Sequence, residues 1–366
     1  MKYRLPILTV VVTVALFGLF NQEKARVVLS LIRSQDAKSS DSPEPKISSA
    51  GPPSQLLAES QRTLRQVPAL ESKLRVRVEI LGHSLSGVGS YLQLAGDDAI
   101  RSRLELKMQV ADRVASLLQV NDGRFSWLRD DLDRDPRLVR IDLRRLREES
   151  SGINPRFAGR AAEDESAGGE GQGRESEELE FVAAGEPNLW DRDQQGTRES
   201  TLRRPWALLG GLPRLICDLD DNFEFEAPRE TRRGDIPVWV IQGRWRTEAL
   251  ARLLPNQRQR IVEGKPLSHT QVPPFIPHAV RLTLGRDDAL PGFPYLIEFL
   301  RTEGRSWQPR QATESEQLAL MVSMEIYEAR VPREIDASLF KYNPANQDVV
   351  DRTEELLGHR GGKTTR

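Results

Sequence analysis

The residues from Arg103 to Val110, RLELKMQV, alternate between polar and apolar side chains. Leu104, Leu106, Met108 and Val110 fall on one parity, and charged or amide side chains fall on the other. This period of two is typical of a β-strand with one buried face. A chain with such strands must bury their apolar faces in its own core or against a ligand.

Further strands are predicted by the same alternation or by runs of β-branched, aliphatic and aromatic residues. Residues 84–94, SLSGVGSYLQL, carry two glycines and indicate a bend or a bulged strand. Asn121-Asp122-Gly123 is a strong hairpin signal, because these residues tolerate positive φ. The other predicted strands are 73–80, 114–120, 124–130, 137–143, 237–245, 279–285, 295–301 and 318–331.

Three segments predict helices. From Ser54, apolar residues recur every three or four positions until Pro68, which ends the pattern. Residues 203–223 predict a helix interrupted at Gly210-Gly211 and Pro213, and 247–264 predict one or two short helices.

Several of the later strands are apolar on both parities. In residues 236–245, Val238 and Val240 share one face while Trp239, Ile241 and Trp245 share the other. Such strands need cover on both sides. The predicted fold class is therefore α+β, with a curved, half-closed antiparallel β-barrel covered by helices.

The amino terminus indicates export. Lys2 and Arg4 precede an uncharged segment from Leu5 to Phe20, in the order of an export signal. We expect residues 1–24 to be an uncleaved helix that anchors the protein to the inner membrane, with the remainder in the periplasm. The alternative is a cleaved signal and a soluble periplasmic protein. Residues 25–54 predict a flexible linker rich in Ser, Pro and charge.

The remainder predicts one domain over residues 55–357, followed by a basic tail at 358–366. Inside this domain, residues from about 149 to 198 are acidic, rich in Gly and poor in aliphatic side chains. This composition predicts a disordered insertion.

The composition argues against several classes of function. A net charge of -1 does not suit a general nucleic-acid binder. The single cysteine, Cys217, rules out an internal disulfide, and the four histidines lack the spacing of a metal site. Asp218, Asp220 and Asp221 form a DLDD cluster that we interpret as surface charge at a helix end. We therefore expect no enzyme activity, no cofactor and no metal; a hydrolase with residues scattered through the fold is a minor alternative.

The predicted strands carry two recognisable motifs, an R-x-E strand at Arg103-Leu104-Glu105 and a DG-x-x-x-W hairpin at Asp122-Gly123 with Trp127. These motifs give the chain a resemblance to the periplasmic outer-membrane lipoprotein carriers, the LolA-like family. The resemblance extends to the strand–turn–strand pattern of 279–301 and to a closing Phe-x-x-x-Pro segment within 335–344. It is discontinuous over residues 55–355. It implies a half-closed barrel whose concave face, under helices, holds acyl chains.

We therefore predict an extracytoplasmic, membrane-tethered binder of a hydrophobic ligand, acting as a carrier or sensor. Its partners would be a lipid or acylated lipoprotein and, through the N-terminal segment, the membrane; no nucleic acid is expected, and the oligomeric state stays open. The alternative is a protein-interaction scaffold of the cell envelope with a filled core. The residues predicted to line the cavity are Leu104, Leu106, Met108, Val110, Phe125, Trp127, Val238, Val240, Leu282 and Leu284, although parity does not say which face is concave.

Overall fold

The computed structural model describes residues 51–80, 83–96, 99–110, 113–131, 137–150, 206–268, 270–286, 290–302, 306–309 and 317–357. The predicted N-terminal anchor, the predicted basic tail and all but the last four residues of the predicted linker lie outside these ranges. So does the predicted acidic insertion, apart from its first two residues, 149 and 150, which belong to a helix. In the described part of the chain, no helix has the length and apolar character needed to cross a bilayer.

The helices agree with the sequence patterns where these were strong. The helix predicted from Ser54 to Pro68 is α3 (Pro53–Gln66), with a proline in its first turn and Val67 at its C-cap. The interrupted helix is α7 (Trp206–Asn222), in which Gly210 and Gly211 have non-helical angles. The other helices in the described ranges are α4 (Leu143–Ser150), α8 (Thr247–Leu253), α9 (Arg258–Val262) and α10 (Thr353–Leu357), with short 3-10 turns η3 (Pro255–Gln257) and η4 (Ala337–Phe340).

All of the predicted strands are present, and several short ones are added. In chain order, the strands are β1 (Ala69–Ile80), β2 (His83–Leu94), β3 (Arg101–Val110), β4 (Arg113–Asn121), β5 (Phe125–Asp130), β6 (Arg137–Asp142), β7 (Phe223–Phe225), β8 (Arg229–Arg233), β9 (Ile236–Trp245), β10 (Leu267–Ser268), β11 (Ala279–Gly285), β12 (Pro294–Thr302), β13 (Ser306–Trp307), β14 (Leu318–Arg330) and β15 (Val349–Asp351).

Thirteen of these strands form one curved sheet in the order β15-β6-β5-β4-β3-β2-β1-β14-β12-β11-β9-β7, with β8 also paired to β9. The pairing is antiparallel except between β15 and β6, which run parallel. Strands β10 and β13 form a separate pair. The two end strands of the large sheet do not pair with each other, so the barrel is open, and the predicted architecture of a curved sheet covered by helices is confirmed.

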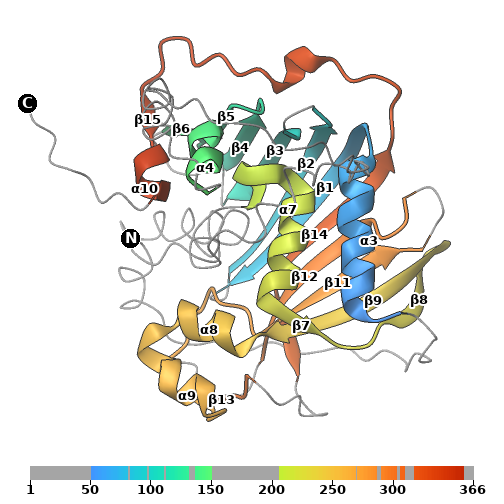
Figure 1. Ribbon diagram of the computed structural model, residues 1–366, viewed down its shortest axis with the longest axis vertical. Coiled ribbons are helices and arrows are strands. Elements are labelled where there is room, and N and C mark those ends of the chain that lie inside the picture. The colour runs from blue at the N-terminus through green and yellow to red at the C-terminus, as the bar shows by residue number, and fades with distance from the viewer. Residues whose placement is uncertain are drawn as a thin grey trace, which may run out of the picture.

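Helices α3 and α7 lie side by side across one face of the sheet (Figure 1). We call this the inner face and the opposite one the outer face. The main hydrophobic core lies between the inner face and the two helices. It contains side chains from α3, from α7 and from the run of neighbouring strands that begins at β4 and ends at β9 in the sheet order. Leu57 and Leu64 of α3 are fully buried in it.

The outer face of the central strands is charged. On β1, Lys73, Arg75 and Arg77 point outward between buried residues of the opposite parity. Arg75 pairs with Glu325 of the neighbouring strand β14 at 2.8 Å, and Lys73 pairs with Glu328. This alternation explains why the chain can be 29% charged and still bury a large core.

Candidate functional site

Six of the ten predicted lining residues lie together on the inner face. Leu104, Leu106, Met108 and Val110 of β3 are all at most 5% exposed, and Leu282 and Leu284 of β11 are fully buried. All six belong to the main core beneath α3 and α7. The structure thus brings together strands from the first and second halves of the chain into one apolar surface.

Phe125 and Trp127 lie on the outer face instead. In the sheet register, Trp127 is paired with Arg140 on one side and with Val120 on the other, and Val120 is paired with Arg103 of β3. Because paired residues point to the same side of a sheet, Trp127 shares the outer face with Arg103. Trp127 packs in a separate small cluster with Val120 and Leu138, to which the partly buried Phe125 and Tyr342 also belong.

Val238 and Val240 are also on the outer face. Leu284, which is in the inner core, is paired with Trp239, so the residues on either side of Trp239 point the other way. Val238 is buried there and Val240 is half-buried. Because β9 is apolar on both parities, its sequence did not indicate which set points toward the helices.

A buried polar network connects the inner face to both helices. Tyr91 of β2 donates its hydroxyl hydrogen to Oε1 of Gln93 at 2.9 Å, and Gln93 Nε2 donates to the carbonyl oxygen of Leu64 in α3 at 2.6 Å. The backbone N–H of Leu212 in α7 donates to Tyr91 Oη at 3.1 Å. Burial raises the pKa of Tyr91 well above its ordinary value, so its hydroxyl stays protonated and can act as donor.

The sequence around Pro68 explains why α3 needs this network. In a helix the carbonyl of Leu64 would accept from the N–H four residues ahead, but that residue is Pro68, which has none. The Gln93 side chain supplies the missing donor from a neighbouring strand. A buried carbonyl without a donor would be costly, so this hydrogen bond fixes the C-terminal end of α3 to β2.

The same network contacts α7 at its interruption, where Tyr91 lies beside Gly211. Gly211 has φ of +63°, and a Cβ atom placed on it would lie 2.1 Å from Tyr91 Oη. Only glycine combines that backbone conformation with so close an approach. Leu212 and Pro213 then start the second part of α7. The N–H of Leu212 has no acceptor within the helix there and donates to the Tyr91 hydroxyl instead.

The DLDD cluster differs from the predicted surface charge at Asp218 and also at Asp220, which is half-buried. Asp221 is exposed, as expected, but the side chain of Asp218 retains only 17% of its surface and pairs with Arg214 at 2.8 Å. Burial raises the pKa of Asp218 to about 7, although Arg214 acts in the opposite direction. Burial also raises the pKa of the adjacent Cys217 thiol to about 11, which makes it a poor nucleophile.

Tyr91, Gln93 and Gly211 were not among the predicted site residues. A signal for Gln93 was present in the sequence, because Pro68 leaves the carbonyl of Leu64 without a helical donor. The donor's identity depends on the pairing of β2 with β1, which no local pattern gives. Within the described ranges, no group of three or more His, Cys, Asp or Glu side chains is placed to hold a metal ion.

No protein-family model matches this chain, and no curated protein matches it. Among solved structures, it is similar to the complex of MucA and MucB from Pseudomonas aeruginosa, at 13% identity and a TM-score of 0.34. That similarity covers 79% of this chain and 60% of the other, so this chain spans about three fifths of that structure.

Two further structures are matched over nearly their whole length. A DUF1329 family protein from Desulfovibrio piger is 9% identical, with a TM-score of 0.30 over 80% of this chain and 98% of that one. A LolA superfamily protein from Nitrosomonas europaea is 11% identical, with a TM-score of 0.25 over 80% of this chain and 99% of that one. The structures that this chain matches thus include LolA superfamily proteins, MucB and a DUF1329 protein, all at low sequence identity, and the likeness is one of fold.

Proposed function

We propose that this protein binds the apolar chain of a lipid or an acylated lipoprotein on its inner face, outside the cytoplasm, as a carrier or sensor. The observation that carries the proposal is the apolar surface that β3 and β11 share with the strands between them. Its cover consists of two helices instead of a second sheet. The sequence resemblance to lipoprotein carriers implies the same class of ligand.

The energetics of such binding require no charged residue. Each buried methylene group contributes about 0.8 kcal/mol, so an acyl chain of ordinary length gains enough from contact with Leu106, Met108 and Leu284 and their neighbours. These side chains are covered by α3 and α7 in the structure, so a ligand would have to displace a helix. The interruption at Gly210-Gly211 offers α7 a place to bend.

One observation favours the alternative function, a protein-interaction scaffold with a filled core. The six inner-face residues are each at most 5% exposed, as they would be in a permanently packed interior. In that case binding would occur on the outside of the protein, and α3 and α7 would remain in place.

Lipid extraction tests the proposal directly. The full chain, purified without detergent from a bacterial envelope, is extracted with organic solvent, and the extract is analysed by mass spectrometry. A fluorescent fatty acid is then titrated into the delipidated protein. We expect stoichiometric lipid in the extract and saturable binding of the probe. A lipid-free extract together with no probe binding would contradict the proposal and favour the scaffold.

A further inference from the structure

The C-terminal residues 331–357, which we call the strap, run from β14 to the edge strand β6 and contact the outer face of the sheet at Arg103 and Trp127. Figure 1 shows this segment leaving β14, passing along one end of the sheet and returning at β15 and α10 beside β6. Only its Phe-x-x-x-Pro part is predicted by a sequence pattern, as a closing segment.

The strap is held at two places. At the first, Phe340 is 1% exposed, Arg103 of β3 donates to the carbonyl of Leu339 at 2.9 Å, and the ring of Tyr342 lies 5.5 Å from that of Trp127. Here the strap covers the small outer cluster of Val120, Trp127 and Leu138. The ring of Tyr342 on the strap thus packs on an apolar surface of the sheet.

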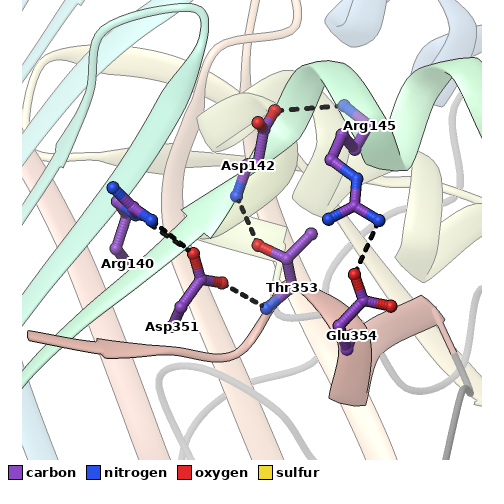
Figure 2. Close-up of polar contacts among 6 residues, drawn as sticks. All are labelled: Arg140, Asp142, Arg145, Asp351, Thr353 and Glu354. Atoms are coloured by element: carbon purple, nitrogen blue, oxygen red, sulfur yellow. Dashed lines mark hydrogen bonds and ion pairs between the residues drawn. The ribbon is translucent and has the colours of Figure 1, made fainter.

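The second place is at the edge of the sheet (Figure 2). Asp351 accepts from Arg140 at 2.7 Å, and Glu354 pairs with Arg145 at 2.6 Å. The Thr353 hydroxyl accepts from the backbone N–H of Asp142 at 2.9 Å. Arginines on β6 and α4 therefore face carboxylates on the strap.

The charge of the two sides is complementary beyond these pairs. The strap carries six acidic residues and three basic ones. The surface beneath it presents Arg103, Arg140 and Arg145, of which Arg103 also pairs with Glu105. Beside them, Arg124 lies over the ring of Phe125 at 4.9 Å and Arg140 lies over the same ring at 5.2 Å. The sheet side of this contact is thus a basic and aromatic surface suited to an acidic peptide.

The strand pairing of the strap at the sheet edge is short, although α10 adds the buried Thr353 and packs Leu356 and Leu357 against the cluster of Ile141, Leu143 and Leu146. Strand β15 pairs with β6 over three residues, all of them exposed, and is the one parallel partner in the described sheet. The ion pairs that hold it are about half exposed, and such pairs contribute little to stability. Edge strands with unpaired backbone groups readily accept another chain.

The connection to β15 is long enough to let it leave and return. Six strand spacings of about 4.8 Å separate β14 from β6, which is about 29 Å. The 18 residues from 331 to 348 span about 60 Å when extended. The strap is therefore not taut, and its departure would not pull on β14.

We propose that the strap occupies, within its own chain, a binding site for an extended acidic peptide of a partner protein. The peptide would add a strand to the edge of β6, place a carboxylate on Arg140 and seat an aromatic side chain on Trp127. This is β-strand addition, in which backbone hydrogen bonds give affinity and side-chain contacts give specificity. The strap competes with the partner and lowers its apparent affinity.

Charge reversal in the full chain tests this site with the strap's own sequence as the probe. The probe is a fluorescent synthetic peptide of residues 335–357. Asp351→Arg with Glu354→Arg opposes Arg140 and Arg145 and should release the strap, so we expect this variant to bind the peptide at least about tenfold more tightly than the wild type. The matched control, Glu334→Arg with Asp348→Arg, changes the strap's charge equally but leaves both ion pairs intact, so its gain in peptide affinity should stay well below that of the first variant.

The reciprocal variant tests specificity. Arg140→Asp with Arg145→Asp should reject the wild-type peptide and bind a peptide that carries Asp351→Arg and Glu354→Arg. Failure of every variant to bind either peptide would overturn the proposal, as would equal binding by all of them.

Hydrogen exchange provides a readout on the unaltered protein. The proposal requires the amide of Arg352, which donates to the carbonyl of Arg140, to exchange much faster than the amides of β3. Equal protection of the two would mean that the strap opens only when the whole protein unfolds, and the proposal would be wrong.

Discussion

The side-chain amide of Gln93 donates to the carbonyl of Leu64 at 2.6 Å and so supplies the hydrogen bond that Pro68 denies to the end of α3. The two residues are 29 positions apart in the chain and both are buried. The same glutamine accepts from Tyr91, which accepts in turn from Leu212 of α7. One side chain of the sheet thus contributes to the position of both covering helices.

Gln93→Leu should lower the free energy of unfolding by about 1–3 kcal/mol, because it leaves the buried carbonyl of Leu64 without a donor. Urea denaturation followed by circular dichroism measures this change. Gln109→Leu, the same substitution at an exposed position of β3, should change the free energy of unfolding by no more than about 0.5 kcal/mol. Equal effects at the two positions would contradict the role assigned to Gln93.

Gly211→Ala should destabilise the protein by several kcal/mol. The new methyl group would lie 2.1 Å from Tyr91 Oη, and φ is +63°. Gly234→Ala is a matched control, because φ there is +59° but nothing lies within 4 Å of the added Cβ. It should cost only about 1 kcal/mol, the backbone penalty alone. Thermal melts of both variants separate the steric clash from the backbone penalty.

Leu106→Glu tests whether the inner face is a ligand surface. If α3 and α7 can leave this face, the new carboxylate can be hydrated. The variant should then remain folded but no longer bind the fluorescent fatty acid. Met108→Glu should behave in the same way. Circular dichroism and probe titration provide the two measurements.

Glu105→Leu is the control for these variants, because Glu105 lies on the outer face, where it pairs with Arg103. It should leave probe binding unchanged. A Leu106→Glu protein that fails to fold would indicate a permanently closed core and favour the scaffold function.

Asp218→Asn should alter the pH dependence of stability. The pKa of Asp218 is raised to about 7 in the folded protein, so its protonated form favours folding, and the wild type loses stability as the pH rises from about 4 to about 7. Asparagine does not titrate. The stability of Asp218→Asn relative to the wild type should therefore rise across this range and level off above pH 7.

Denaturation curves of both proteins between pH 4 and pH 8 measure this difference. Asp221→Asn, at an exposed position of the same helix, is the comparison. A constant difference between Asp218→Asn and the wild type over the whole range would show that Asp218 does not titrate there.

The sequence by itself determined most of the elements and the class of fold. Pro53 and Pro68 lie at the two ends of α3, because proline suits the first turn and cannot continue a helix. The glycine pair at Gly210-Gly211 marked the interruption in α7. The alternation in β1 and β3 indicated both the strands and their buried parity. These signals are local, so a short window of sequence contains them.

The tertiary structure alone decided which faces meet and where the short strands pair. Parity separates the two sides of a strand but cannot name the side that helices cover, so Val238, Val240, Phe125 and Trp127 were grouped with Leu104 and Leu284 although they lie on the opposite face. Strand β15 has three residues and pairs with β6 from 211 positions away. Contacts of this kind exist only after the chain has folded, because they depend on which distant segments come to lie beside one another.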